Sequence, residues 1–246
     1  MMGDYKLTKH DFLLSAYPGH AFFFTMLAQV VYAFVVFGLA GSLIPGIAEA
    51  ARGEGENSTE ILWKMTVVLQ VVILLHLTFW AERVGAGPFA GEMKTTPKWV
   101  GIGIFGAPLL QFLAIIFAYT VLADGGENWA YRNEEARDFV NAATIGPVMI
   151  ASLVLLAPII EEVAFRGVAL SCLLGRGVPV FASIAIQAVG FTALHLQYTP
   201  AAMFTVFVLG LFLGWLRVAS KSISAPILAH MAVNLQAVIV LGSSGA

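Results

Sequence analysis

Long apolar stretches are the feature that most constrains what this chain can fold into. A helix needs roughly twenty apolar residues to cross the hydrocarbon core of a bilayer, and about seven such windows follow one another along the sequence. They run from Ala21 to Ile47, Ile61 to Trp80, Trp99 to Ala123, Thr144 to Leu174, Val178 to Leu196, Pro200 to Leu216 and Ala225 to Leu241. The windows predict an all-α fold, a polytopic transmembrane helix bundle. Because the fourth window is over-long, it is either one span or an interfacial piece plus a span, and a count of eight is the alternative.

The composition points to the same class. Hydrophobic residues make up 59% of the 246 residues and charged residues 11%, with a mean hydropathy of +0.85, whereas soluble domains carry about 25% charged residues. No polar interruption is long enough to fold by itself. We therefore expect a single integral membrane domain over residues 1–246.

Charge and cysteine content exclude some classes of function. The net charge of −2 leaves no broad basic surface, so nucleic acid is not expected as a partner. Cys172 is the only cysteine, which excludes an intramolecular disulfide and a cysteine-rich metal site.

The cations predict an orientation, because cytoplasmic loops usually carry more Lys and Arg than external loops. With the N-terminus inside, most cations fall at cytoplasmic ends of spans: Lys6, Lys9, Arg83, Lys94, Lys98, Arg166, Arg176, Arg217 and Lys221. Arg52, Arg132 and Arg137 fall outside, and Lys64 lies near the outer end of the second span. The bias favours an N-in, C-out chain.

One run of charge interrupts the apolar fourth window, from Glu161 to Arg166. On a helix, Glu162 and Arg166 lie four residues apart in the favourable acid-before-base order, so we expect them to neutralise each other. Glu161 then remains without a partner on its own helix.

Three further polar residues lie in the last windows, namely His195, His230 and Asn234. Phe191 precedes His195 by four residues, and His230 precedes Asn234 by the same spacing, so each pair shares one helix face. Counted from the turn at Gly175 to Gly177, Glu161 lies about 20 Å back and His195 about 25 Å beyond it. From the start of the last span, His230 and Asn234 lie about 9 and 15 Å in. A cluster of Glu161, His195, His230 and Asn234 inside the membrane is geometrically reasonable.

These residue types suit amide hydrolysis by water. A carboxylate with a histidine can deprotonate water, and imidazole or carboxamide N–H groups can stabilise an oxyanion. Alternatives are a zinc-dependent membrane hydrolase with Glu161, His195 and His230 as ligands, and a proton-coupled transporter. Taken one at a time, such residues also serve as interhelical hydrogen-bonding groups that only fix the bundle.

In order and spacing, these motifs resemble the CAAX protease and bacteriocin-processing (CPBP, or Abi) family of membrane proteins, which share EExxxR, FxxxH and HxxxN or HxxxD. Here they read Glu161-Glu162…Arg166, Phe191…His195 and His230…Asn234. The resemblance covers about Pro158 to Gln236, and it implies a catalytic core in residues 144–241.

The resemblance implies a glutamate-dependent, metal-independent intramembrane endopeptidase without a cofactor. Glu161 would activate water with the help of His195, and His230 with Asn234 would form the oxyanion site. Glu162, Arg166 and Phe191 would support them. Some family members look like non-proteolytic immunity or scaffold proteins, which is the alternative within the family.

The same resemblance sets the expected partners and location. The substrate would be a membrane-associated peptide or protein, either lipidated or carrying a C-terminal tag, in addition to the lipid bilayer itself. We expect a multi-pass protein of a prokaryotic cytoplasmic membrane. The sequence leaves the oligomeric state open.

Overall fold

The computed structural model describes residues 6–9, 11, 58–83, 86–87, 91–122, 146–196 and 198–243. All regular secondary structure in this part of the chain is helical. The first predicted span, Ala21 to Ile47, and the cations Arg52, Arg132 and Arg137 lie outside the described residues. The helical class is confirmed, whereas the count of seven spans is not.

Each of the remaining predicted windows coincides with a helix or with a continuous run of helical segments. α4 (Ser58–Arg83) stands alone. The next run consists of α5 (Pro97–Gly101), the π-helical η1 (Ile102–Gly106), α6 (Ala107–Phe117) and the π-helical η2 (Ala118–Leu122). The over-long window forms α8 (Pro147–Ile150), η3 (Ala151–Leu156), α9 (Ala157–Glu162), η4 (Val163–Ala169) and α10 (Leu170–Gly175). The last three are α11 (Val180–Ala193), α12 (Pro200–Ser220) and α13 (Ser224–Ser243).

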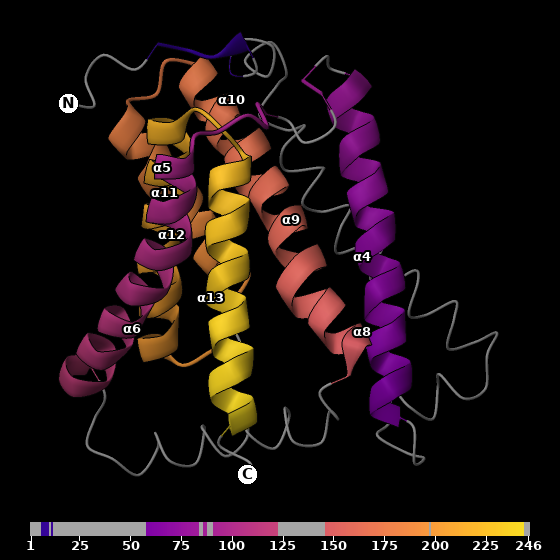
Figure 1. Cartoon of the computed structure of the whole chain (residues 1–246). Helices are drawn as coiled ribbons and strands as arrows, with labels where there is room; N and C mark the ends of the chain where they lie inside the picture. The colour runs from indigo at the N-terminus through magenta and orange to yellow at the C-terminus, as the bar shows by residue number, and fades with distance from the viewer. Residues whose placement is uncertain are drawn as a thin grey trace.

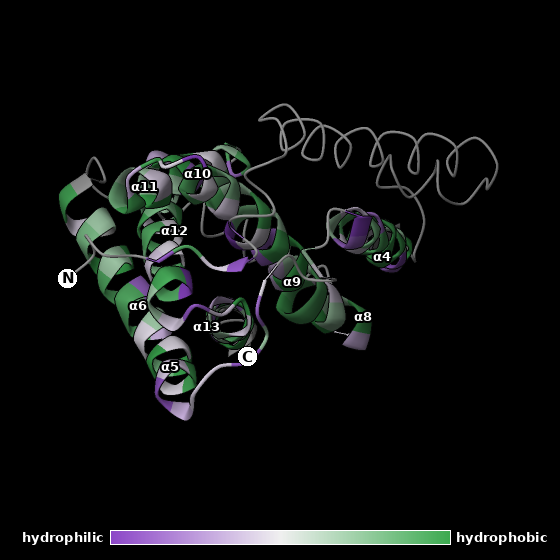
Figure 2. Ribbon diagram, turned by 90° about the horizontal axis from the view of Figure 1, so that it is seen from above, coloured by the Kyte–Doolittle hydropathy of each residue, from purple (hydrophilic) through white to green (hydrophobic). Residues whose placement is uncertain are grey.

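Helices of these lengths fit a membrane protein. Within the described residues, 4 helices are long and apolar enough to cross a bilayer: Glu60–Arg83, Pro97–Phe117, Pro147–Gly175 and Pro200–Ser220. Val180–Ala193 and Ser224–Val240 are shorter apolar helices. Figure 2 shows hydrophobic residues over most of the helix surfaces, and Phe105, at 77% exposed, and Phe181, at 74%, point outward. An apolar outer surface is what contact with lipid requires.

Helix starts are set by proline at the first helical position, where a missing N–H costs nothing. Pro97, Pro147 and Pro200 occupy such positions. The Thr199 hydroxyl adds a cap, because it accepts a hydrogen bond from the Ala202 amide at 3.0 Å. Gly177, with φ +77°, makes the turn between α10 and α11.

Consecutive helices run in opposite directions, so several of their ends meet at one end of the bundle (Figure 1). The Ile223 amide donates to the Glu92 carbonyl at 2.8 Å, which joins the segments preceding α13 and α5. Arg217, near the end of α12, donates to Ser171 of α10 at 3.4 Å and lies 3.8 Å from Asp11. This end carries the exposed cations Lys94, Lys98, Arg176 and Lys221, and we call it the basic end.

α8 to α10 run obliquely across the bundle, with α4 packed on one side and α11 to α13 on the other (Figure 1). One apolar core joins Leu77 of α4 to Val163 and Phe165 of η4 and Phe191 of α11. A second core joins α6, α12 and α13 around Leu213, Leu216 and Ala229. The charged run at the junction of α9 and η4 therefore lies against the first of these cores.

Candidate active site

The last two residues of α9 are both glutamates, and they have different surroundings because adjacent side chains on a helix point in different directions. Glu162 is completely buried, whereas the Glu161 side chain is 27% exposed. Successive side chains on a helix point about 100° apart, so one carboxylate faces the bundle interior and the other a space open to solvent or substrate. Glu161 is the one that an approaching molecule could reach.

The ion pair predicted from the spacing is present. Arg166 Nη1 donates to Glu162 Oε1 at 2.7 Å, and both side chains are fully buried. Arg166 Nη2 donates to the Gly210 carbonyl at 3.2 Å, and the guanidinium carbon lies 4.5 Å from the centre of the Phe191 ring. These contacts pair the buried guanidinium with a carboxylate, a backbone oxygen and an aromatic face, as a buried charge requires.

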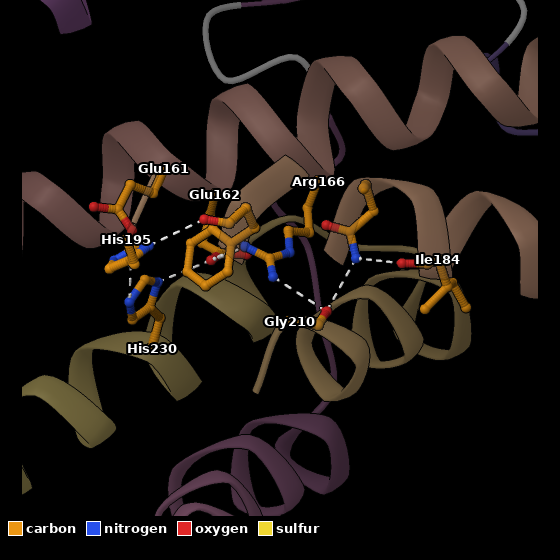
Figure 3. Close-up of polar contacts among 9 residues, drawn as sticks. Glu161, Glu162, Arg166, Ile184, His195, Gly210 and His230 are labelled. Atoms are coloured by element: carbon orange, nitrogen blue, oxygen red, sulfur yellow. Dashed lines mark hydrogen bonds and ion pairs between the residues drawn. The ribbon is translucent and has the colours of Figure 1, made fainter. Parts of the chain in front are cut away.

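His230 of α13 lies between the two carboxylates (Figure 3). Its Nδ1 is 2.9 Å from Glu162 Oε1, and its Nε2 is 3.8 Å from Glu161 Oε2. Glu162 Oε1 also accepts from Arg166, and a carboxylate oxygen in such a pair is an acceptor, so the hydrogen bond places a proton on His230 Nδ1. Nε2 then carries a second proton only when the ring is charged. The sequence did not predict the bond between Glu162 and His230.

His195 lies just beyond α11 and not inside a helix, which corrects the expectation that the fifth span continues to Leu196. The helix ends at Ala193, and the chain turns through the hydrogen bond from the His195 amide to the Thr192 carbonyl at 2.9 Å. The side chain still reaches back one turn, because Nδ1 is 3.0 Å from the Phe191 carbonyl. That carbonyl is an acceptor, so Nδ1 carries the proton and Nε2 presents a lone pair.

The Phe191 ring links the two histidines. Its centre lies 5.2 Å from the ring centre of His195 and 5.8 Å from that of His230, and it packs edge-to-face on Phe165. A rigid, buried aromatic ring in contact with both imidazoles restricts their orientations. Among the described residues, His230 is the histidine within ion-pair distance of Glu161, whereas His195 joins the group through Phe191.

Asn234 lies one turn beyond His230 on α13 and points toward η3. Its Nδ2 donates to the Leu153 carbonyl at 2.8 Å. A carboxamide has two N–H groups, so this bond leaves one of them for another acceptor. The structure thus shows Asn234 joining α13 to η3 and does not place it in contact with Glu161.

Sequence reasoning missed Tyr198, which lies in the link between α11 and α12. Its ring centre is 5.2 Å from that of His195. Partial burial, followed by the negative charge of Glu161, raises the pKa of the Tyr198 hydroxyl, so this group stays protonated near neutral pH. The available signal was an aromatic hydroxyl three residues after His195 and two residues before the proline that begins α12.

A zinc-dependent hydrolase would need three side chains close enough together to coordinate one zinc ion. Within the described residues, no three His, Cys, Asp or Glu side chains are grouped to hold a metal ion, so Glu161, His195 and His230 do not form such a cluster in this arrangement.

Comparison with known proteins identifies the part of the chain that holds this site. Residues 143–236 match the family described as "Type II CAAX prenyl endopeptidase Rce1-like". The matched stretch is less than half of the chain and contains the part that resembles the CAAX protease and bacteriocin-processing family. No curated protein and no solved structure matches the chain. The match confirms the resemblance inferred from the three motifs, and the matched family is described as one of endopeptidases. All the motifs, from Glu161 to Asn234, lie inside the matched region.

Proposed function

We propose that this protein is an intramembrane endopeptidase that hydrolyses a peptide bond with water activated by Glu161, without a metal ion. One observation carries the proposal. Glu161 is a partly exposed carboxylate 3.8 Å from His230 Nε2, while the neighbouring Glu162 is fully buried and neutralised by Arg166. A reachable base beside a histidine, within otherwise apolar helices, is suited to deprotonate water.

Hydrolysis then needs one proton to move from water to the leaving amine. Glu161 takes the proton as the water oxygen bonds to the substrate carbonyl carbon. The C–N bond breaks as Glu161 returns that proton to the amine nitrogen. His195, whose Nε2 presents a lone pair, assists by accepting a hydrogen bond from the same water.

The negative oxygen formed by this attack needs N–H donors. His230 would donate from Nε2 when both ring nitrogens carry a proton, while Nδ1 stays bonded to Glu162. Asn234 would contribute the N–H that is not bonded to Leu153. Glu162, Arg166 and Phe191 act as positioning residues, because each contacts the His230 ring or a group bonded to it.

The substrate we propose is a membrane-associated peptide or protein, lipidated or carrying a C-terminal tag. Two facts support this class. The matched family is described as prenyl endopeptidases, and the site lies within helices that are apolar enough to be in a bilayer. A prenylated C-terminus is one member of this class, and a bacteriocin precursor and a bacterial sorting tail are others.

A non-proteolytic scaffold is the second candidate, and a specific observation favours it. Glu162, Arg166 and His230 bond to one another, and Asn234 bonds to a backbone carbonyl, so much of the polar cluster could serve only to join helices. The two candidates differ in what Glu161 does.

The test compares cells that produce the native protein with cells that produce Glu161→Gln, by sequencing the C-termini of the membrane proteome. We expect uncut precursors to accumulate in the variant, because an amide cannot act as a base. With an isolated precursor, the rate should fall by about 10²- to 10⁴-fold. Glu60→Gln, an exposed acid on α4, is the control and should cleave normally.

Wild-type processing by a correctly folded Glu161→Gln protein would contradict the proposal and favour the scaffold. Treatment with a metal chelator tests the alternative that the protein is a zinc-dependent hydrolase. Activity should survive exhaustive chelation, and loss of activity that zinc restores would show that the protein is a metalloenzyme.

A further inference from the structure

An apolar cavity of about 180 Å³ lies between η4–α10 and α11, apart from the candidate active site. Its lining residues are Phe165, Ala169, Cys172, Leu173, Arg176, Ile186, Gln187 and Gly190. None of them is Glu161, His195, His230 or Asn234. From Phe165 to Arg176 the lining follows one face of a helix for about 16 Å, so the cavity is elongated along the helix axis.

The cavity lies at the edge of the bundle. α10 and α11 lie side by side at the outer rim when the molecule is viewed along the helices (Figure 2). Ile186, which lines it, is 52% exposed, and its neighbour Val189 is 60% exposed. Gly190 leaves the wall open, because a Cβ built there would meet Phe165 alone, at 3.5 Å. A chain could therefore enter from the lipid side.

A cation closes one end of this apolar space. Arg176 follows α10 in the turn at the basic end, and its Nη1 donates to the Cys172 carbonyl at 2.9 Å. The guanidinium has five N–H groups, so this bond leaves donors for another ligand. Within the described residues, no carboxylate forms an ion pair with Arg176.

We infer that this cavity binds one acyl chain of an anionic phospholipid, with the phosphate against Arg176. The apolar lining matches the chain, and Arg176 matches the phosphate in charge and in its bidentate hydrogen-bonding geometry. The exposed cations Lys94, Lys98 and Lys221 favour an anionic membrane surface at the same end of the bundle. This site is separate from the proposed peptidase activity, and Glu161→Gln should bind the lipid as the native protein does.

The test uses the purified, delipidated full-length protein and phosphatidylglycerol or phosphatidylcholine with identical chains. Native mass spectrometry measures the affinity for each lipid. The wild type should retain one phosphatidylglycerol and prefer it over phosphatidylcholine, and Arg176→Gln should weaken that preference about fivefold. Lys94→Gln is the matched control, because it removes an exposed cation from the same end but not from the cavity, and its preference should change little.

Two further measurements locate the lipid. Gly190→Leu fills the cavity mouth on an exposed helix face and should reduce the binding of both lipids. A phosphatidylglycerol with a diazirine on its chain should label peptides within residues 165–176 and 186–190. Three results would each overturn the inference. Arg176→Gln and Lys94→Gln could show the same preference for phosphatidylglycerol. Gly190→Leu could bind both lipids as the wild type does, or the diazirine could label only other helices.

Discussion

At the scale of single residues, Glu162 decides how the site is built. Its buried Oε1 receives hydrogen bonds from Arg166 at 2.7 Å and from His230 at 2.9 Å. Removing two charges from water costs several kcal/mol per ion, and their attraction seldom returns more than that. The pair therefore contributes less to stability than to position, since it fixes where the His230 ring points and which nitrogen faces Glu161.

Removing one member of the Glu162 and Arg166 pair should cost more stability than removing the charge of both members. Arg166→Met should destabilise the protein by about 3–5 kcal/mol, because Glu162 would be left buried without its cation. Combining it with Glu162→Gln should recover most of that loss. Thermal unfolding in detergent, followed by circular dichroism, measures both changes.

An exposed ion pair elsewhere in the protein provides the control for these substitutions. Glu60 and Lys64 of α4 have the same spacing and the same 2.7 Å separation, but both side chains are 60% exposed. Lys64→Met should change stability by only about 0–1 kcal/mol. A double variant at the buried pair that is no more stable than Arg166→Met would contradict this account.

At the scale of elements, the crossing of α11 and α12 positions Arg166. Gly210 of α12 lies so close to α11 that a Cβ there would meet Ala188 Cβ at 3.1 Å and Ala188 Cα at 3.3 Å. The same residue's carbonyl accepts hydrogen bonds from Arg166 at 3.2 Å and from Gln187 at 3.0 Å. Close packing and a buried polar contact thus meet at one residue, as small residues in membrane helices allow.

Gly210→Ala should therefore destabilise the bundle by about 1–3 kcal/mol, because the backbone of α11 must move to admit the methyl group. The Gly210 carbonyl would move with it, so cleavage should also slow. The measurements are the thermal midpoint and the rate on an isolated precursor.

Gly101→Ala provides the comparison, since a Cβ at this helical position would meet nothing within 4 Å. Replacing glycine by alanine in an open helical position is expected to be neutral or slightly stabilising. If Gly210→Ala behaves as Gly101→Ala does, the close approach is not what holds these helices in register.

At the scale of the whole molecule, alternating helix directions bring several exposed cations to one end of the bundle. Lys94, Lys98, Arg176 and Lys221 are the exposed cations of the basic end. α4 begins at the opposite end (Figure 1), and Glu60 lies in its first turn. Positive residues are held on the cytoplasmic side of membranes. We therefore expect the basic end to face the cytoplasm.

Labelling from outside tests this orientation, with Cys172→Ala as the background so that each variant has one cysteine. A membrane-impermeant maleimide added to intact cells should label Glu60→Cys and should not label Lys94→Cys. Both should react after permeabilisation. The reverse pattern in intact cells would show that the protein is inserted with the opposite orientation.

Much of the architecture and part of the site could be predicted from the sequence. Apolar windows predict helices because a bilayer admits few other structures, and the described helices fall where the windows are. The pair of Glu162 and Arg166 could be predicted too, because the 3.6-residue period places residues four apart on one face of the same helix. Motif order within residues 143–236 was sufficient to indicate the family.

Contacts between helices were decided by tertiary packing alone. A depth estimate could bring Glu161, His195, His230 and Asn234 to similar levels, but it could not give the rotation of α13 about its axis. That rotation depends on side-chain packing in the core around Ala225, Ala229 and Leu216. It turns His230 toward both carboxylates and Asn234 toward Leu153. Local spacing fixes partners within one helix, whereas partners on different helices depend on how whole surfaces fit together, which no short stretch of sequence specifies.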